Sequence, residues 1–406
     1  MKQRFVWNLN EVGREQRDEV GGKAANLGEM LRAELPVPGG FVVSTDAYRR
    51  FLVENDCCDR LARLLDAWEG EGIQEEVAEQ IRELFAAGTI PPVVERAIRQ
   101  SYDDLGRPLT VVRSSATAED LPGASFAGQY SSFLNVQGPV ALLQAIRDCW
   151  ASLWNDRALA YRRKQGLENR GLAHGVVVQR LVDAEKSGIL FTANPVNGRR
   201  DQLVLNAAWG IGESIVAGEV TPDQWVLRKP EGTVVEAVTA QKEVMTVRAG
   251  EGVRTAPVPR ELQSAISLGS EEVHALARLG LQAEAFFGSP QDIEWAFADD
   301  TFYLVQSRPI TSLYPLPAPR PGKKDLRVHL NINLYSQAMK EPFTPLGADL
   351  IREMAKDVIR RLGRKDPEDE ETLWWFQIVG GRVFVDITEM LRNPRRWDRL
   401  TRNPND

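Results

Sequence analysis

One arginine of this sequence stands where a strand-like run meets a loop of small residues, and that combination suits the binding of phosphate. The run Leu109 to Val112 is apolar and β-branched in character, and Arg113 follows it directly. Two serines and a stretch rich in glycine, serine and alanine then extend to Gln129. Triphosphate oxygens need a fixed guanidinium together with backbone N–H groups that can approach closely. The segment is therefore a candidate phosphate site, and a surface loop with an incidental arginine is the alternative.

A second set of oxygens, with another arginine, lies near residue 300. The stretch 291–306 is typical of two strands joined by a turn, and pairing centred on Asp300 places Glu294 opposite Gln306. A carboxylate beside an amide carbonyl offers oxygen ligands to Mg²⁺, which prefers one or two carboxylates plus phosphates. Arg308, two residues further on, shares that face and can reach a phosphate chain. The alternative is a solvated hairpin with a Glu–Arg pair.

Two weaker signals accompany these segments. Gly21 and Gly22 open the backbone before a helical stretch and bring Lys23 to a helix N-terminus, where anions bind. The Walker pattern G-x-x-x-x-G-K-[ST] is absent. Gln179 to Val182 ends an apolar strand whose extended backbone can hydrogen-bond an adenine edge, although an ordinary core strand has the same composition.

Both helices and strands must position these groups, which predicts an α+β protein. Ser44 suits the N-cap of a helix over 46–54. Residues 175–182 and 188–192 are typical of strands, and we expect them to pair around a polar turn at 183–187. The other expected helices are 24–33, 57–68, 74–87, 92–105, 140–165, 271–287 and 346–362, and the other expected strands are 40–43, 131–136, 202–207 and 223–227.

The composition argues against several classes of protein. The chain has 406 residues, 43% hydrophobic and 26% charged, with a formal net charge of −7, which is ordinary for a globular protein of two or three domains. The acidic balance argues against nucleic acid as a partner, and no apolar run approaches the length of a membrane span. Three cysteines without a CxxC pair predict reduced thiols and a cytoplasmic location. Three histidines that do not cluster argue against zinc.

Six blocks of the sequence resemble one family. The chain resembles the nucleotide-binding domain shared by pyruvate phosphate dikinase, phosphoenolpyruvate synthase and rifampicin phosphotransferase, with the blocks in family order within residues 8–311. The resemblance implies an ATP-grasp-like architecture, in which two α/β lobes hold ATP and Mg²⁺ between them. The matching blocks are GGKAANLGEM, VPGGFVVS, VVRSSATAEDLPGASFAGQY, SGILFTANP, WGIGESIVAG and DIEWAF followed by YLVQSRPI.

The resemblance implies roles for the charged residues already singled out. Lys23 and Arg113 would bind the phosphates of ATP, and Glu294 and Gln306 would hold Mg²⁺. Arg308 would stabilise charge on the transferring phosphates, a role in which arginine contributes on the order of 10³ or more in rate. The catalytic residues implied are therefore Arg113 and Arg308.

The resemblance also implies the rest of the nucleotide pocket. It assigns a loop to the phosphates, a strand end to the adenine and a carboxylate to the region near the ribose. In chain order these are Ser125, Gly128 and Gln129 of the loop, Gln179 and Leu181 of the strand end, and Glu213.

The part of the chain after residue 313 differs in character. Four prolines between 315 and 321 are typical of an extended linker. The segment P-F-T-P-L-G that follows resembles the start of the substrate-binding domain in the rifampicin-type arrangement. The expected organisation is an ATP-binding domain over 1–313 with lobes of roughly 1–180 and 181–313, a linker over 314–325, and a partial, mainly helical second domain over 326–406.

One element of the family is missing from these 406 residues. Family enzymes carry a histidine in a G-G-x-x-[ST]-H context that relays a phosphoryl group, and no such segment occurs here. His174 precedes an apolar strand, which is typical of a structural residue. We therefore expect a fragment, a split gene product or a truncated homologue, whose partner would be a separate phosphohistidine domain or chain.

The reaction implied is the cleavage of ATP to AMP, with one phosphate passing to a small-molecule acceptor and one to water or phosphate. The acceptor would be pyruvate or a hydroxylated antibiotic such as rifampicin. Two other hypotheses stay open: a non-catalytic module that binds ATP and signals by closing its lobes, and an ATP-grasp ligase that releases ADP.

Overall fold

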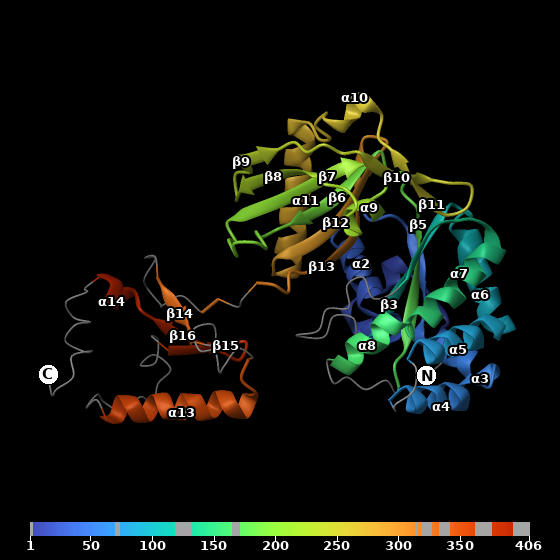
Figure 1. The fold of residues 1–406 in the computed structure, drawn as a ribbon, viewed down its shortest axis with the longest axis horizontal. Coiled ribbons are helices and arrows are strands. Elements are labelled where there is room, and N and C mark those ends of the chain that lie inside the picture. The colour runs from blue at the N-terminus through green and yellow to red at the C-terminus, as the bar shows by residue number, and fades with distance from the viewer. Residues whose placement is uncertain are drawn as a thin grey trace. The chain divides into compact units, whose positions relative to one another are not determined.

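The computed structural model describes residues 3–69, 74–117, 131–164, 171–313, 316–317, 327–332, 342–361 and 376–392, and it divides into two compact units, Met1–Ser312 and Leu313–Asp406 (Figure 1). Within the described residues, no helix combines the length and the apolar character that crossing a membrane requires. The expected α+β class is confirmed, and the first unit is built from two lobes that each contain one large sheet.

The first lobe holds a five-stranded antiparallel sheet with helices packed on one face (Figure 1). Alternation along the strands sends Val112, Val176 and Val178 into the helical core, while Val177 and Arg113 lie on the opposite face. The strands in spatial order are β1 (Val6–Asn8), β2 (Gly40–Val43), β5 (His174–Arg180), β3 (Thr110–Ala116) and β4 (Ser132–Val136). The helices are α3 (Thr45–Glu54), α4 (Cys57–Glu69), α5 (Gln74–Ala87), α6 (Pro92–Asp104), α7 (Gly138–Ser152) and α8 (Asp156–Lys164).

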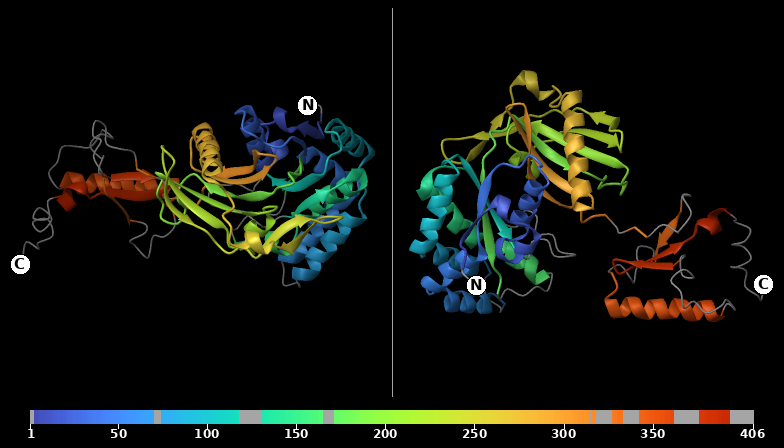
Figure 2. Two further views of the ribbon diagram at one scale, coloured as in Figure 1. Left: turned by 90° about the horizontal axis from the view of Figure 1, so that it is seen from above. Right: turned by 180° about the vertical axis from the view of Figure 1, so that it is seen from behind.

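The second lobe holds a six-stranded antiparallel sheet, and the long helix α11 (Ser270–Phe287) crosses one of its faces (Figure 2). Ile293, Trp295 and Leu304 point to that helix and form a continuous core with it. In spatial order the strands are β13 (Thr301–Pro309), β12 (Gln291–Ala298), β6 (Lys186–Phe191), β7 (Gln202–Trp209), β8 (Asp223–Arg228) and β9 (Thr233–Val238). A separate hairpin of β10 (Val244–Arg248) and β11 (Val253–Pro257) and the short helices α9 (Glu213–Val216) and α10 (Arg260–Gln263) complete the lobe.

Helix α2 (Gly22–Arg32) joins the two lobes. It follows the short turns η1 (Leu9–Glu11), η2 (Arg14–Gln16) and α1 (Arg17–Val20), and its apolar residues share one core with the second sheet. At its start the Ala24 amide donates to Ser115 Oγ of β3 over 3.1 Å. Two residues later Asn26 Nδ2 donates to the Ser307 carbonyl of β13 over 3.1 Å. The helix therefore fixes β3 and β13 with respect to each other.

Gly21 is required where α2 approaches β3. Its φ is +80°, and a Cβ atom built there would lie 1.8 Å from the Ser115 carbonyl oxygen. We expect Gly21→Ala to lower the free energy of unfolding by about 3 to 5 kcal/mol, because both backbone strain and a clash with a fixed strand act together. Urea denaturation measures the loss. Gly138→Ala is the matched control, since Gly138 has φ +81° with open space around it; a loss of only about 1 to 2 kcal/mol is expected there. Equal losses in the two variants would contradict the close approach.

Three sequence predictions about these elements were wrong. The helix expected over 140–165 is two helices, because Asn155 caps α8 by accepting from the Ala158 amide over 2.8 Å. The strand expected to end at Arg113 continues to Ala116, so Arg113 lies inside β3 and not at its end. Strands β5 and β6 do not pair with each other: β5 pairs with β2 and β3, and β6 pairs with β12 and β7. Their connection crosses from one lobe to the other.

The second unit contains one long helix, as expected, and a small sheet that the pattern did not indicate. Arg327 Nε donates to Asp386 Oδ2 over 2.8 Å at the start of this sheet. The described elements are α13 (Pro345–Arg361), α14 (Thr388–Arg392) and three antiparallel strands in the order β14 (His329–Asn331), β16 (Arg382–Asp386) and β15 (Phe376–Val379).

Candidate active site

Four polar side chains line the face of the β12–β13 hairpin that points away from α11. Asp292 and Glu294 belong to β12, and Gln306 and Arg308 belong to β13. Glu294 is paired with Gln306, as predicted, and Asp292 is paired with Arg308. Because side chains alternate along a strand, these four residues share one face while Ile293 and its neighbours fill the core.

A β-bulge creates this arrangement. The hairpin turns through Asp299 and Asp300, and near the turn Trp295 is paired with Leu304. The register then shifts by one residue, which leaves Val305 without a partner in the ladder before Glu294 meets Gln306. A one-residue shift moves side chains to the other face of a sheet, so the bulge is what places Gln306 beside Glu294.

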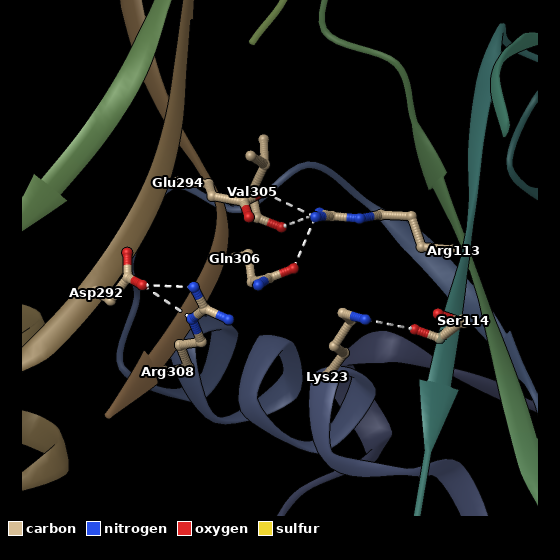
Figure 3. Close-up of polar contacts among 8 residues, drawn as sticks. All are labelled: Lys23, Arg113, Ser114, Asp292, Glu294, Val305, Gln306 and Arg308. Carbon is tan, nitrogen blue, oxygen red and sulfur yellow. Dashed lines mark hydrogen bonds and ion pairs between the residues drawn. The ribbon is translucent and has the colours of Figure 1, made fainter. Parts of the chain in front are cut away.

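Arg113 reaches this face from the other lobe (Figure 3). Its Nη2 atom donates to Glu294 Oε2 over 2.8 Å and to Gln306 Oε1 over 2.7 Å, and its Nη1 atom donates to the Val305 carbonyl over 2.9 Å. The carbonyl freed by the bulge is thus the third acceptor. The Arg113 and Glu294 side chains are 14% and 22% exposed, so solvent screens their ion pair less than it would a surface pair.

Two further cations surround the same space (Figure 3). Lys23, at the start of α2, donates from Nζ to the Ser114 carbonyl over 3.1 Å. Arg308 donates from Nε and Nη2 to Asp292 Oδ2 over 2.9 and 2.7 Å. Three cationic side chains from α2, β3 and β13 therefore meet two carboxylates, and the surplus of positive charge favours an anionic ligand.

Asp292 lies in one of the family blocks, but neither the sequence nor the resemblance assigns it a role. The signal that identifies it is positional, since it lies two residues before Glu294 and opposite Arg308 in the same hairpin. Burial raises the pKa of the Asp292 carboxyl, Arg308 opposes that rise, and Glu294 adds to it. The carboxylate therefore holds the guanidinium in place while its own charge is disfavoured by burial.

The raised pKa of Asp292 predicts a pH-dependent effect of its removal. A carboxyl whose pKa is higher in the folded than in the unfolded chain favours folding while protonated, and that advantage is lost as the pH rises through the folded-state value. We expect the melting temperature of Asp292→Asn, taken relative to that of the unmodified protein, to be higher at pH 8 than at pH 4. Thermal melts at both pH values measure it. Asp201→Asn is the control, since Arg199 lowers the pKa of the exposed Asp201 and the sign should not be the same; an equal shift in both variants would contradict the prediction.

The sequence predicts six further residues of the nucleotide pocket. Ser125, Gly128 and Gln129 are outside the described residues. The Gln179 side chain is buried and donates to the Pro38 carbonyl over 3.0 Å. Their roles stay predictions.

The last two predicted pocket residues are Leu181 and Glu213. The Leu181 amide donates to the Leu109 carbonyl over 2.9 Å, so this N–H group is used within the first lobe. Glu213 begins α9, and loss of solvation together with the nearby Glu219 raises the pKa of its carboxyl. Both roles likewise stay predictions.

The two oxygens that Arg113 contacts fit a divalent cation. Glu294 Oε2 and Gln306 Oε1 lie within 2.8 Å of one nitrogen atom, so they converge on a common point. A carboxylate oxygen and an amide oxygen are hard donors of the kind that Mg²⁺ binds, and Mg²⁺ completes its shell with water and phosphate.

Comparison with known proteins places these residues in a family. A model described as pyruvate phosphate dikinase, AMP/ATP-binding domain, matches residues 17–321. Rifampicin phosphotransferase from Streptomyces sviceus is 38% identical over 399 residues, which cover 97% of this chain and 43% of that protein. A probable phosphoenolpyruvate synthase from Methanocaldococcus jannaschii is 38% identical over 331 residues, which cover 79% of this chain and 27% of that protein.

The chain thus spans less than half the length of these curated relatives. Among solved structures, D-alanine–D-alanine ligase from Helicobacter pylori aligns with a TM-score of 0.21 and 10% identity over 54% of each chain. This structural similarity is too low to support an argument about function.

Proposed function

The chain belongs to the pyruvate phosphate dikinase AMP/ATP-binding domain family, and we propose that it binds ATP and Mg²⁺ between its lobes as part of a dikinase-type phosphotransferase. The observation that carries the proposal is the meeting of Arg113 from the first lobe with Glu294 and Gln306 from the second. A cation-rich cleft that also holds converging oxygens can neutralise both a triphosphate and its metal ion.

We assign the roles of the cluster from its contacts. Lys23 and Arg113 bind phosphate oxygens, since each directs a cationic group into the space between the lobes. Glu294 and Gln306 hold Mg²⁺, which supplies charge neutralisation to the phosphates. Arg308 contacts the phosphates that are transferred, and Asp292 keeps its guanidinium aligned through two hydrogen bonds to one oxygen.

The proposed reaction cleaves ATP to AMP. One phosphoryl group passes to an acceptor through a phosphohistidine supplied by another domain or chain, and the other passes to water or phosphate. For the acceptor we propose a rifampicin-like hydroxyl compound ahead of pyruvate. Similarity to rifampicin phosphotransferase covers 97% of the chain, whereas similarity to the phosphoenolpyruvate synthase covers 79%.

Calorimetry and product analysis test this function together. Titration with ATP in the presence of Mg²⁺ should show binding, and incubation with ATP, acceptor and the phosphohistidine domain should yield AMP. Binding without turnover would favour a non-catalytic regulatory module. Formation of ADP would favour a ligase that acts through an acyl phosphate, and absence of binding would refute the proposal.

A further inference from the structure

The contact between the lobes uses the same two oxygens that the metal ion requires. Arg113 Nη2 lies 2.8 Å from Glu294 Oε2 and 2.7 Å from Gln306 Oε1. Resting on the proposed function, we propose that Arg113 competes with the divalent cation for these oxygens, so that free metal is excluded and metal enters together with the triphosphate.

Geometry makes the two arrangements alternatives. Nη2 occupies a position from which one atom contacts both oxygens, and a divalent cation held by both oxygens from the same side would need that space, at about 2.1 Å from each. Two cations at one partly buried carboxylate also repel each other strongly, because the effective dielectric constant there is well below that of water. Arg113 must therefore leave Glu294 and Gln306 before the metal can bind them.

Binding of the triphosphate would favour release of the Arg113 guanidinium from Glu294 and Gln306. Arg113 is anchored on β3, in the opposite lobe from its acceptors, and a rotation of its side chain toward an anion breaks the contacts without moving either sheet. A guanidinium forms bidentate, charge-assisted hydrogen bonds with phosphate that replace those lost to the carboxylate and amide. Nucleotide binding thus exposes the metal ligands at the moment that the metal arrives with the phosphates.

Competition predicts that removal of the guanidinium tightens metal binding in the absence of nucleotide. Mn²⁺ is the probe, and the electron paramagnetic resonance signal of free Mn²⁺ gives its affinity for the intact chain. We expect Arg113→Gln to bind Mn²⁺ about fivefold to tenfold more tightly than the unmodified protein, the gain that corresponds to loss of one partly buried ion pair.

The matched control is Lys23→Gln, which removes the same charge from the same space. The Lys23 ammonium donates to the Ser114 carbonyl, and its loss leaves Arg113 in contact with Glu294 and Gln306. A smaller effect in this variant supports competition at the oxygens. An equal gain in both variants would mean that only the general charge matters, and no gain in Arg113→Gln would likewise overturn the inference.

Two further variants keep the test decisive. Arg113→Lys preserves the charge and guards against loss of folding in the glutamine variant. Its compact ammonium group lacks the planar fork that lets the guanidinium reach Val305 and both metal-ligand oxygens at once, so we expect an intermediate Mn²⁺ affinity. Glu294→Gln separates this inference from the proposed function. If Glu294→Gln binds Mn²⁺ with ATP as well as the unmodified protein does, the metal site itself is wrong. If Glu294→Gln loses Mn²⁺ while Arg113→Gln gains nothing, only the competition is wrong.

Discussion

Arg308→Ala is expected to slow the conversion of ATP to AMP about a thousandfold while the far-UV circular dichroism stays unchanged. The guanidinium lies on the same sheet face as the proposed metal ligands and is aligned by the two hydrogen bonds that it donates to Asp292. Charge that develops on the transferring phosphates is stabilised best by a cation that needs no reorganisation during the reaction. The fold should survive, since the side chain is 32% exposed and its partner Asp292 lies on the sheet face opposite the apolar core.

The rate of AMP formation at saturating ATP, with the acceptor and the phosphohistidine domain present, measures this effect. Arg228→Ala is the matched control, because Arg228 ends β8 in the same sheet and is exposed. A comparable loss of rate in both variants would point to damage to the sheet, and an unchanged rate in Arg308→Ala would remove Arg308 from the reaction.

The same variant should also affect Asp292. Arg308 is the group that lowers the pKa of this buried carboxyl, so its removal should raise that pKa further. Titration of Asp292 by nuclear magnetic resonance would detect the change, which does not depend on catalysis.

The sequence predicted the pairing of Glu294 with Gln306, although the physical reason differs in part from the one assumed. A hairpin with a two-residue turn at Asp299 and Asp300 and a regular ladder would place Glu294 opposite Val305. The bulge adds the missing residue and restores the expected pair. Bulges depend on the contacts that a strand makes with its surroundings, and periodicity alone does not reveal them. Here the contact is the hydrogen bond that Arg113 Nη1 donates to the Val305 carbonyl.

Contacts between distant parts of the chain could not be predicted from local pattern. Arg113 and Glu294 are 181 residues apart, and only the family resemblance brought them to one site. The hairpin expected from β5 and β6 failed for the related reason that both are apolar strands joined by a short polar stretch. That pattern is satisfied equally by two strands that join separate sheets, and pairing is decided by partners remote in sequence.

Local signals succeeded where a few adjacent residues determine the structure. Ser44 caps α3 by accepting from the Ala47 amide, as its residue type indicated. The sequence indicates that Gly21 and Gly22 leave the backbone accessible to an anion. The structure shows that Gly21 is also needed where α2 packs closely against β3. A glycine required by a close approach and one required by a ligand look alike in sequence.

Glu294→Gln is expected to reduce AMP formation about a thousandfold, with loss of metal binding as the cause. A metal ion that neutralises phosphate charge contributes several kcal/mol to the barrier, and about 4 kcal/mol corresponds to a factor of about a thousand in rate. The amide keeps the shape of the side chain and can still accept a hydrogen bond from Arg113, which retains Gln306 and the Val305 carbonyl as acceptors. The fold should therefore remain intact, and the defect should diminish as Mn²⁺ or Mg²⁺ is raised. Glu236→Gln makes the same chemical change on the exposed edge strand β9 and should leave the rate unaltered. A defect in Glu294→Gln that no metal concentration relieves, with unchanged Mn²⁺ affinity in the presence of ATP, would show that the carboxylate serves only to position Arg113.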